Sequence, residues 1–316
     1  MKKSFAFLAS VADGGKRLDH FLQEQNLSLS RTRIKQLIAD GQFVLNDRQV
    51  KPATKLRAGD RVGGFVPAPR PLEVSGENLP LDVLHEDADI IVVNKAPGMV
   101  VHPAPGFLSG TLVNALLFHC TDLSGINGVL RPGIVHRLDR FTSGVIVAAK
   151  NDLAHESLVR QFKSRSVKKR YLAVAYGHFF QPEGLVDASL GRHPKKRTMI
   201  STHTQNPRQA VTRWKVLEAL RHFTFLEMFP ETGRTHQIRV HLSSIGHPIL
   251  GDSVYCRRKH LKEIEDPTIR REAEKFPRQA LHASDLSFLH PHSGEPVTFH
   301  APLARDIKGM VEFLRA

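Results

Sequence analysis

Cysteine is scarce in this sequence, and long apolar runs are absent. Only two cysteines occur, Cys120 and Cys256, which excludes a disulfide framework and a cysteine-based zinc site and predicts a reducing, cytoplasmic setting. No apolar run approaches the roughly 20 residues that span a bilayer, so no membrane span is predicted. The apolar stretch 5–9, after Lys2 and Lys3, is short for a signal peptide, and a strand that opens the first domain explains it as well.

Acidic residues are fewer than basic ones: 31 Asp and Glu stand against 45 Lys and Arg, a formal net charge of +14. This excess favours an anionic partner, and nucleic acid is the commonest such partner. An acidic membrane surface is the alternative, but neither a basic amphipathic helix nor a polybasic cluster beside a lipid anchor is apparent. With 41% hydrophobic and 24% charged residues, the composition is that of a globular protein, and 316 residues allow one large domain or two ordinary ones.

The first segment, about residues 15–63, has the pattern of two short helices followed by strands. Apolar residues recur at helical spacing in 18–22, and a second helix is predicted between Ser30, as its N-cap, and Gly41. The strand-like pieces of the segment are 43–45 and 61–62. Basic residues outnumber acidic ones here, and composition alone leaves a solvated helix face and a phosphate-tracking surface as alternatives.

The spacing of several short elements in this segment resembles the S4 RNA-binding module. These elements are Arg17-Leu18-Asp19, the basic run 30–35, Gly41, Val44-Leu45-Asn46 and Ala58-Gly59-Asp60. The resemblance implies a small α/β domain over residues 1–65 that binds structured RNA through its shape and phosphates. It implies that Arg31, Arg33 and Lys35 contact the RNA.

A composition change separates this segment from the rest of the chain. Residues 66–80 contain four prolines and are predicted to form a semi-rigid linker, so that 81–316 is a second domain. Its predicted strands are 90–93, 99–101, 144–149, 171–176 and 223–228, and its predicted helices are 111–118, 151–165, 235–245 and 305–315. This pattern predicts a mixed, strand-rich α+β domain.

The stretch 133–144 carries the strongest chemical signal. It places Asp139 between Arg137 and Arg140, shortly before Thr142-Ser143-Gly144 and a buried strand. Taken alone, Asp139 is more readily a turn residue than a catalytic carboxylate, because a lone Asp beside small polar residues is common in turns.

His136-Arg137-Leu138-Asp139 followed by Thr142-Ser143-Gly144 resembles the signature of the RluA family of pseudouridine synthases. The further blocks that fit the family in order are 86–98 with His102-Pro103, 169–177, 231–241 with its extension 246–252, 281–283 and 300–303. The likeness covers nearly the whole chain, and with the S4-like segment it is most similar to the RluD branch, which modifies large-subunit ribosomal RNA. It implies a catalytic domain with a mixed, largely antiparallel central sheet.

Two departures from the family pattern are visible. Arg140-Phe141 fills the two positions between Asp139 and Thr142, where the family varies. The charged stretch 256–278 looks like a branch-specific insertion and leaves the identity of the target uridine open.

The resemblance carries functional roles to matched positions of this sequence. Asp139 matches the essential aspartate, Tyr171 the tyrosine that packs on the target base, and Arg234 the arginine that pairs with the aspartate. Arg137 matches a residue thought to help displace the flipped base, and Leu281 an apolar position that lines the pocket. Without the resemblance, Tyr171 would be interpreted as a strand residue with its ring in the core. Arg234 would be interpreted as part of a surface salt bridge, and Leu281 as ordinary core packing.

The implied reaction explains why these residue types are needed. The C1′–N1 bond of uridine breaks, the base turns and C1′ bonds to C5, with no redox change and no group lost, so no cofactor and no metal are expected. A carboxylate serves as a nucleophile at C1′, adds to C6 of the ring, or acts as a base at C2′ through a glycal; the sequence leaves all three routes open. Unstacking the base costs a few kcal/mol, and stacking on Tyr171 returns about 1–3 kcal/mol.

Two rival functions fit the same residues: a non-catalytic RNA-binding or ribosome-assembly factor, and the same chemistry on transfer RNA. The expected partner is structured RNA, above all large-subunit ribosomal RNA, free or in a pre-ribosomal particle. A monomer without membrane contact is expected. The basic loop 192–197 is either a phosphate clamp or a solvated charge run. His236 and His241 lack convincing zinc spacing.

Overall fold

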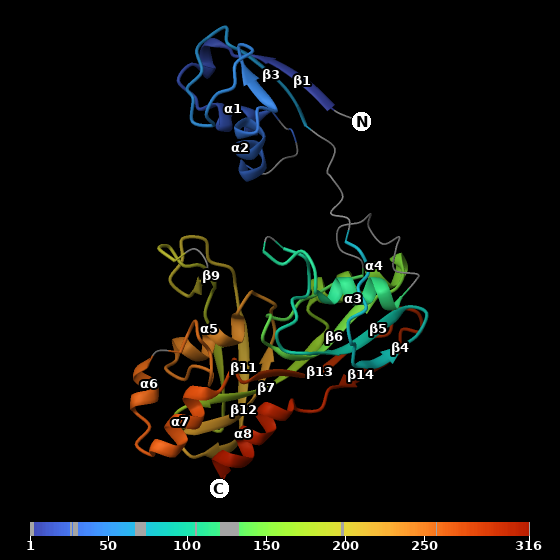
Figure 1. The fold of residues 1–316 in the computed structure, drawn as a ribbon, viewed down its shortest axis with the longest axis vertical. Coiled ribbons are helices and arrows are strands. Elements are labelled where there is room, and N and C mark those ends of the chain that lie inside the picture. Colours follow the sequence, from blue (N-terminus) through green and yellow to red (C-terminus); the bar gives the residue numbers. More distant parts are fainter. Residues whose placement is uncertain are drawn as a thin grey trace. The chain divides into compact units, whose positions relative to one another are not determined.

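The computed structural model describes residues 3–25, 27, 31–66, 74–104, 106–120, 133–196, 199–256 and 258–315, without the side chains of residues 3, 31–33 and 258. The chain divides into two compact units, Met1–Pro71 and Leu72–Ala316 (Figure 1). The predicted linker 66–80 lies at this division. Its residues 67–73 are outside the described part, whereas its second half is fixed to the larger unit, because Glu77 N donates to Asn114 O and the Asn114 side chain donates to Ser75 O.

The smaller unit is a three-stranded antiparallel sheet with two helices. Strands β1 (Lys3–Leu8), β3 (Arg61–Val66) and β2 (Phe43–Leu45) lie in the order β1-β3-β2, and the helical elements are η1 (Val11–Asp13), α1 (Leu18–Glu24) and α2 (Arg31–Ala39). The apolar N-terminal stretch is therefore a strand in this structure. Apolar residues of both helices, among them Phe21 and Ile34, pack with Phe43 in one core. This arrangement matches the predicted helix-helix-strand order.

A nine-stranded sheet forms the centre of the larger unit, with strand order β4-β5-β6-β13-β7-β12-β11-β8 and β14 paired to β13. The strands are β4 (Val83–Glu86), β5 (Ile90–Lys95), β6 (Ser143–Ala149), β7 (Lys168–Tyr176), β8 (Glu183–Asp187), β11 (Val211–Leu220), β12 (Phe223–Pro230), β13 (Leu281–Leu289) and β14 (Pro296–His300). Every pairing is antiparallel except that of β6 with β13, which is parallel. The predicted mixed, largely antiparallel sheet is confirmed.

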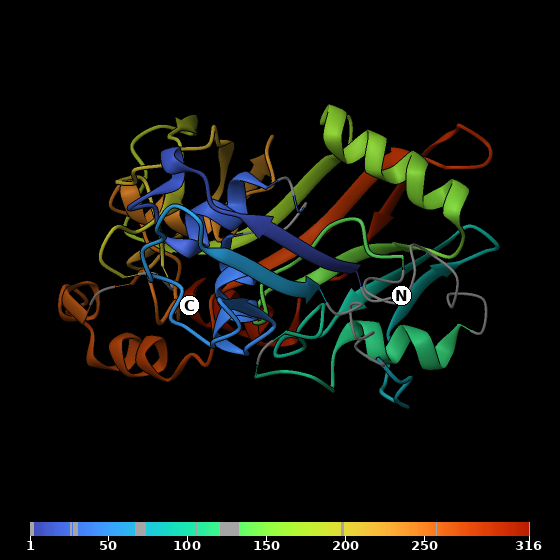
Figure 2. The same cartoon turned by 90° about the horizontal axis from the view of Figure 1, so that it is seen from above.

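Alternation along β5 explains why both faces of this sheet are covered. Ile90 and Val92 pack with α4 (Asp152–Ser164), whereas Ile91 and Val93 pack with α3 (Leu112–His119). Successive side chains of a strand point to opposite faces, so a continuous apolar run requires a partner on each side. Figure 2 shows the two helices, in yellow-green and blue-green, on opposite sides of the strands.

The remaining helices are α5 (Gln237–Ser244), α6 (Arg258–Lys262), α7 (Pro267–Lys275) and α8 (Arg305–Arg315), and a separate small hairpin pairs β9 (Gly191–Arg192) with β10 (Ile200–Ser201). The four predicted helices correspond to α3, α4, α5 and α8. The predicted strand at 99–101 is wrong, because Val100 makes only an isolated bridge to Thr111. The charged stretch 256–278 contains α6 and α7, and α7 buries Ile269 and Ala273. Among the described residues, no helix combines the length and apolarity needed to cross a membrane.

Candidate active site

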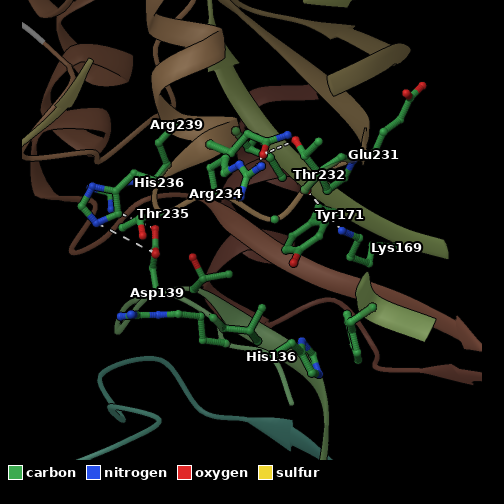
Figure 3. A pocket seen from close by; sticks show the side chains of 18 of the residues that line it. His136, Asp139, Lys169, Tyr171, Glu231, Thr232, Arg234, Thr235, His236 and Arg239 are labelled. Carbon is green, nitrogen blue, oxygen red and sulfur yellow. Dashed lines mark hydrogen bonds and ion pairs between the residues drawn. The ribbon is translucent and has the colours of Figure 1, made fainter. Parts of the chain in front are cut away.

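A cavity of about 620 Å³ opens where the segment before β6 faces the start of β7 and the loop that leads into α5 (Figure 3). Five residues predicted from the sequence lie in its wall: Arg137, Asp139, Tyr171, Arg234 and Leu281. They come from four separate stretches of the chain, so the fold brings them together from long sequence distances. His136, Lys169, His236 and Arg239 line the same cavity.

The turn that carries Asp139 is tied down by its own backbone and by two buried cations. Thr142 N donates to Asp139 O at 3.0 Å. The ammonium of Lys95 donates to Arg140 O at 3.1 Å, and the guanidinium of Arg278 donates to Phe141 O at 3.0 Å. Since Lys95 and Arg278 are almost fully buried, the carbonyls of the turn replace their lost hydration and the turn is fixed in return.

Gly144 is required by the parallel pairing of β6 with β13. Its φ is +113°, and a Cβ at this position would lie 2.1 Å from Ala283 O. The preceding residue, Ser143, is hydrogen-bonded through Oγ to Nδ1 of His282 at 3.0 Å. The Thr-Ser-Gly sequence therefore joins two strands closely rather than merely forming a turn, and it sets the position at which β6 begins after Asp139.

Lys95 makes the stability of this turn dependent on pH. Burial, followed by the charge of Arg278, lowers the pKa of Lys95 to about 7, against the opposing attraction of Asp139. An unfolded lysine keeps its proton to about pH 10, so folding releases a proton between these values and rising pH favours the folded state.

We therefore expect the unfolding free energy of the wild-type protein to rise relative to that of Lys95→Met between about pH 6 and 9, by up to a few kcal/mol. Urea unfolding at several pH values measures this difference. Parallel stability curves for the two proteins would contradict the assignment of a strained, buried ammonium. Using the difference between the two proteins removes contributions from other groups, such as Lys169, whose pKa burial lowers to about 8.

The ion pair of Asp139 is made by Arg239. One terminal nitrogen of Arg239 donates to Asp139 Oδ2 at 3.0 Å, while its Nε and other terminal nitrogen donate to the two oxygens of Asp252 at 2.7 and 2.9 Å. Asp252 is fully buried and also accepts from the backbone N–H groups of Val254 and Tyr255. This double anchoring fixes the guanidinium and thereby orients the Asp139 carboxylate.

The predicted ion pair between Asp139 and Arg234 is wrong. Arg234 lies in the loop before α5, where its Nε donates to Gln209 O at 3.1 Å and its backbone N–H donates to the side chain of Gln237. Arg239 lies in the first turn of α5 and its side chain is buried against the cavity. Both arginines fall within one sequence block, and only the direction in which α5 leaves the loop decides which of them reaches the carboxylate.

His236 lines the cavity and Tyr255 contacts its ring, although the sequence indicated no role in the reaction for either residue. Nε2 of His236 lies 3.9 Å from Asp139 Oδ1, and Nδ1 lies 2.8 Å from the hydroxyl of Tyr255. This hydroxyl accepts from Ile200 N at 3.0 Å, so its own proton is available for Nδ1. In that arrangement a neutral His236 carries its proton on Nε2, facing Asp139. Burial lowers the pKa of His236, against the attraction of Asp139.

His136 in the same motif has a structural role. Its Nε2 accepts from Val147 N at 3.1 Å, and its ring stacks on Phe162 at 4.6 Å between centroids. Burial, followed by the charge of Lys169, lowers the pKa of His136 to about 3. The ring is therefore neutral near pH 7 and orients the entry into β6 instead of transferring a proton as a cation.

Tyr171 and Leu281 form an apolar part of the wall on neighbouring strands. Tyr171 belongs to β7 and Leu281 opens β13, paired with Ala173 of β7. Burial, and then the charge of Asp139, raise the pKa of Tyr171, so its hydroxyl stays protonated near neutral pH. In Figure 3 the Tyr171 ring and the Asp139 carboxylate lie on different sides of the cavity.

Basic side chains dominate the charge of the wall. Those of Arg137, Lys163, Arg165, Lys169, Arg234 and Arg239 line the cavity, against the carboxylates of Asp139 and Glu231. Such an excess of positive charge favours the binding of a polyanion. It also offsets the repulsion between the Asp139 carboxylate and a phosphate backbone that approaches it.

The comparisons with known proteins agree with this geometry. Residues 89–244 match the family described as RNA pseudouridylate synthase, and residues 16–62 match the S4 domain. The chain is 48% identical over 307 residues to the RNA pseudouridine synthase YlyB of Bacillus subtilis, with 97% of each chain covered. It is 43% identical to the ribosomal large subunit pseudouridine synthase D of Zymomonas mobilis, covering 95% of this chain and 94% of that protein. The chain belongs to the RNA pseudouridine synthase family.

Solved structures support the same family. Human RNA pseudouridylate synthase domain containing 4 is 27% identical, with a TM-score of 0.59, covering 74% of this chain and 93% of that chain. Human RNA pseudouridylate synthase domain containing 1 is also 27% identical, with a TM-score of 0.57, covering 76% of this chain and 97% of that one. As a pseudouridine synthase, the protein is an isomerase that converts uridine to pseudouridine in RNA, and it carries an S4 RNA-binding domain.

Of the three S4-domain residues predicted to contact RNA, the structure describes the side chain of only one, Lys35. The side chains of Arg31 and Arg33 lie outside the described part. Lys35 is half-exposed on α2, with its ammonium 3.7 Å from Asp19, a buried carboxylate that is also paired with Arg17. Lys35 therefore has both a structural contact and a solvent-facing surface.

The basic loop 192–197 and His241, which the sequence left without a clear role, are not among the residues that line the cavity. The basic loop 192–197 lies in the β9–β10 hairpin, and its last residue, 197, is outside the described part. His241 is a core residue, because its two ring nitrogens contact Thr212 Oγ1 and Ala188 O. Among the described residues, the two clusters with metal-ligand spacing, at Glu86 and at Asp87, are both outside the synthase cavity.

Proposed function

We propose that this protein isomerises one or more uridines of large-subunit ribosomal RNA, with Asp139 as the catalytic carboxylate. The observation that carries the proposal is the placement of Asp139 in a basic cavity, oriented by Arg239 and facing Tyr171 and Leu281. The likeness to proteins named ribosomal large subunit pseudouridine synthase D supports the choice of RNA. The reducing setting expected from the scarcity of cysteine fits a cytoplasmic enzyme. The proposed form is a monomer that acts on free RNA or on a pre-ribosomal particle.

The residues divide the reaction between them. Arg137 helps the target base leave its stack, and the base enters the cavity against the ring of Tyr171 and the side chain of Leu281. The Asp139 carboxylate then attacks C1′, adds to C6 or removes a proton from C2′. In each route the C1′–N1 bond breaks, the base turns, C1′ bonds to C5 and the C5 proton is lost.

Arg239 has a positioning role in this scheme. Its pairing with Asp252 holds the guanidinium in place while Asp139 changes charge during the reaction. Arg234, in the loop before α5, contacts the RNA in this scheme rather than pairing with the Asp139 carboxylate. The hydroxyl of Tyr171, which stays protonated, relays the C5 proton by passing on its own proton as it receives that one.

Mapping of pseudouridines in cells with and without the protein tests this proposal. Reverse transcription after carbodiimide treatment should show the loss of one or a few pseudouridines from large-subunit ribosomal RNA, restored by the wild-type gene. Loss confined to transfer RNA would overturn the choice of substrate. No loss in any RNA, together with no product from the purified protein, would favour a non-catalytic RNA-binding or assembly factor.

A further inference from the structure

Two aromatic rings and a guanidinium form an exposed stack beside the catalytic turn. The guanidinium carbon of Arg140 lies 4.6 Å from the ring centroid of Phe107 and 4.9 Å from that of Phe141. Phe107 is 41% exposed, Phe141 is 42% exposed, and the neighbouring Leu108 is 64% exposed. These side chains therefore place exposed aromatic rings and a positive charge side by side at the surface.

This stack is fixed before any ligand arrives. Arg140 Nε donates to Gly98 O at 3.0 Å, and Gly98 N donates back to Arg140 O at 2.8 Å. Phe107 is held by reciprocal backbone hydrogen bonds with Ala104, at 2.8 and 2.9 Å. Because backbone and guanidinium are already ordered, a flat ligand that stacks here loses little binding energy to the ordering of protein groups.

The position of the stack connects it to the cavity. Asp139 and Thr142 line the cavity, whereas Arg140 and Phe141, which lie between them in the turn, are exposed. On the other side, His102 lines the cavity and belongs to the loop that leads to Phe107. The stack is therefore joined, through its own neighbours in the chain, to the cavity that would receive the target base.

We propose that Phe107, Arg140 and Phe141 form a stacking platform for an unpaired base next to the target uridine, with the Arg140 charge directed to its phosphate. The proposal rests on the proposed function and adds the binding of a flanking nucleotide to it. Extrusion of one uridine disrupts the stacking of its neighbours, and aromatic faces and arginine planes are the groups that stack on such bases regardless of sequence. The basic cavity wall and the net charge of +14 favour RNA over a protein as the occupant.

A cycle of RNA affinities tests the platform. The probe is a fragment of the RNA that mapping identifies, intact or with an abasic nucleotide on the 5′ or the 3′ side of the target uridine. Wild-type protein should lose about tenfold in affinity when one of these bases is removed. Phe107→Ala/Phe141→Ala should bind the intact fragment about tenfold more weakly and lose little more with the abasic one, because the base and the rings contribute to the same contact.

Matched variants separate stacking from other effects. Phe180→Ala removes a fully exposed ring elsewhere on the domain and should leave affinity unchanged. Phe107→Leu/Phe141→Leu keeps apolar surface but lacks flat faces, so it should bind as weakly as the alanine pair. Wild-type affinity in the leucine pair would indicate a general apolar contact, as with a protein partner, and would overturn the proposal. Equal loss on abasic substitution in wild type and the alanine pair would do the same.

The readouts keep this inference separate from the proposed function. Equilibrium binding needs no turnover, so purified wild-type protein that binds the mapped fragment without converting its uridine would contradict the proposed function, while the affinity cycle would still test the platform. Unchanged cooperative thermal unfolding shows that the variants are folded.

Discussion

Asp139→Asn is expected to abolish pseudouridine formation, lowering the single-turnover rate by at least about 10⁴-fold. An amide has the size of the carboxylate but is neither a useful nucleophile nor a base, so all three routes are blocked. RNA affinity should stay within about threefold, because the basic wall that attracts phosphates is unchanged. Tritium release from C5-labelled uridine in the RNA measures the rate, and filter binding measures the affinity.

Asp152→Asn is the matched control for this experiment. Asp152 is an exposed carboxylate in the first turn of α4, outside the cavity, so its amide should leave the rate unchanged. Asp139→Asn should also remain folded, because Arg239 keeps both hydrogen bonds to Asp252. Substantial conversion by folded Asp139→Asn protein would remove Asp139 from the chemistry.

Arg239→Gln is expected to be far more harmful than Arg234→Gln. Loss of Arg239 leaves the buried Asp252 without its countercharge, and removal of one member of a buried ion pair costs about 3–5 kcal/mol of stability. The carboxylate of Asp139 loses its orientation at the same time, so we expect a rate at least about 100-fold lower. Arg234→Gln should leave stability within about 1 kcal/mol and act mainly on RNA affinity. Urea unfolding and single-turnover assays measure the two effects.

A double variant separates the two consequences of losing Arg239. Arg239→Gln/Asp252→Asn removes both buried charges and should recover part of the lost stability, without recovering the rate. A recovered rate would mean that the arginine acts only by keeping the domain folded. If Arg234→Gln instead proved the slower enzyme at saturating RNA, the ion pair seen here would not be the one that prepares the carboxylate.

Helices and strands could be predicted from the sequence where the apolar pattern of a single segment determines its structure. The continuous run 90–93 indicated a buried strand because both of its faces are covered, and the periodicity of 305–315 indicated an amphipathic helix, now seen as α8. The stretch 99–101 has the same apolar character. There the chain instead turns so that Met99 O accepts from the buried ammonium of Lys95. Such a tertiary contact has no signature in the periodicity.

The charged stretch 256–278 conceals two helices because few of its residues are buried. Helix α7 buries little beyond Ile269 and Ala273, so no apolar stripe is evident. Its start could nevertheless have been predicted: Asp266 caps the helix by accepting from Thr268 N and Ile269 N, and proline follows at the first helical position.

The site was predictable only as far as its motifs were distinctive. The signature around Asp139 and the separate blocks 169–177 and 281–283 pointed to Asp139, Tyr171 and Leu281, and all three line the cavity. The prediction of the partner arginine was wrong because two tertiary features place Arg239 at the carboxylate. Its guanidinium is held by Asp252, thirteen residues away, and the left-handed conformation of His236 sets the direction in which α5 begins. His236 and Tyr255 were missed because their link exists only after the β9–β10 hairpin and α5 have packed together.

The single parallel pairing in the sheet has a consequence for biosynthesis. Strand β13 lies between β6 and β7, so the strand that follows the Asp139 turn and the strand that carries Tyr171 become neighbours in one sheet only through a segment made much later. During translation the N-terminal elements emerge and fold first, but this sheet cannot close until residues 281–289 have left the ribosome. A nascent or truncated chain that ends before β13 would leave backbone N–H and C=O groups unpaired at the facing edges of β6 and β7, and it would lack a working cavity. The protein therefore becomes catalytically competent only late in its synthesis.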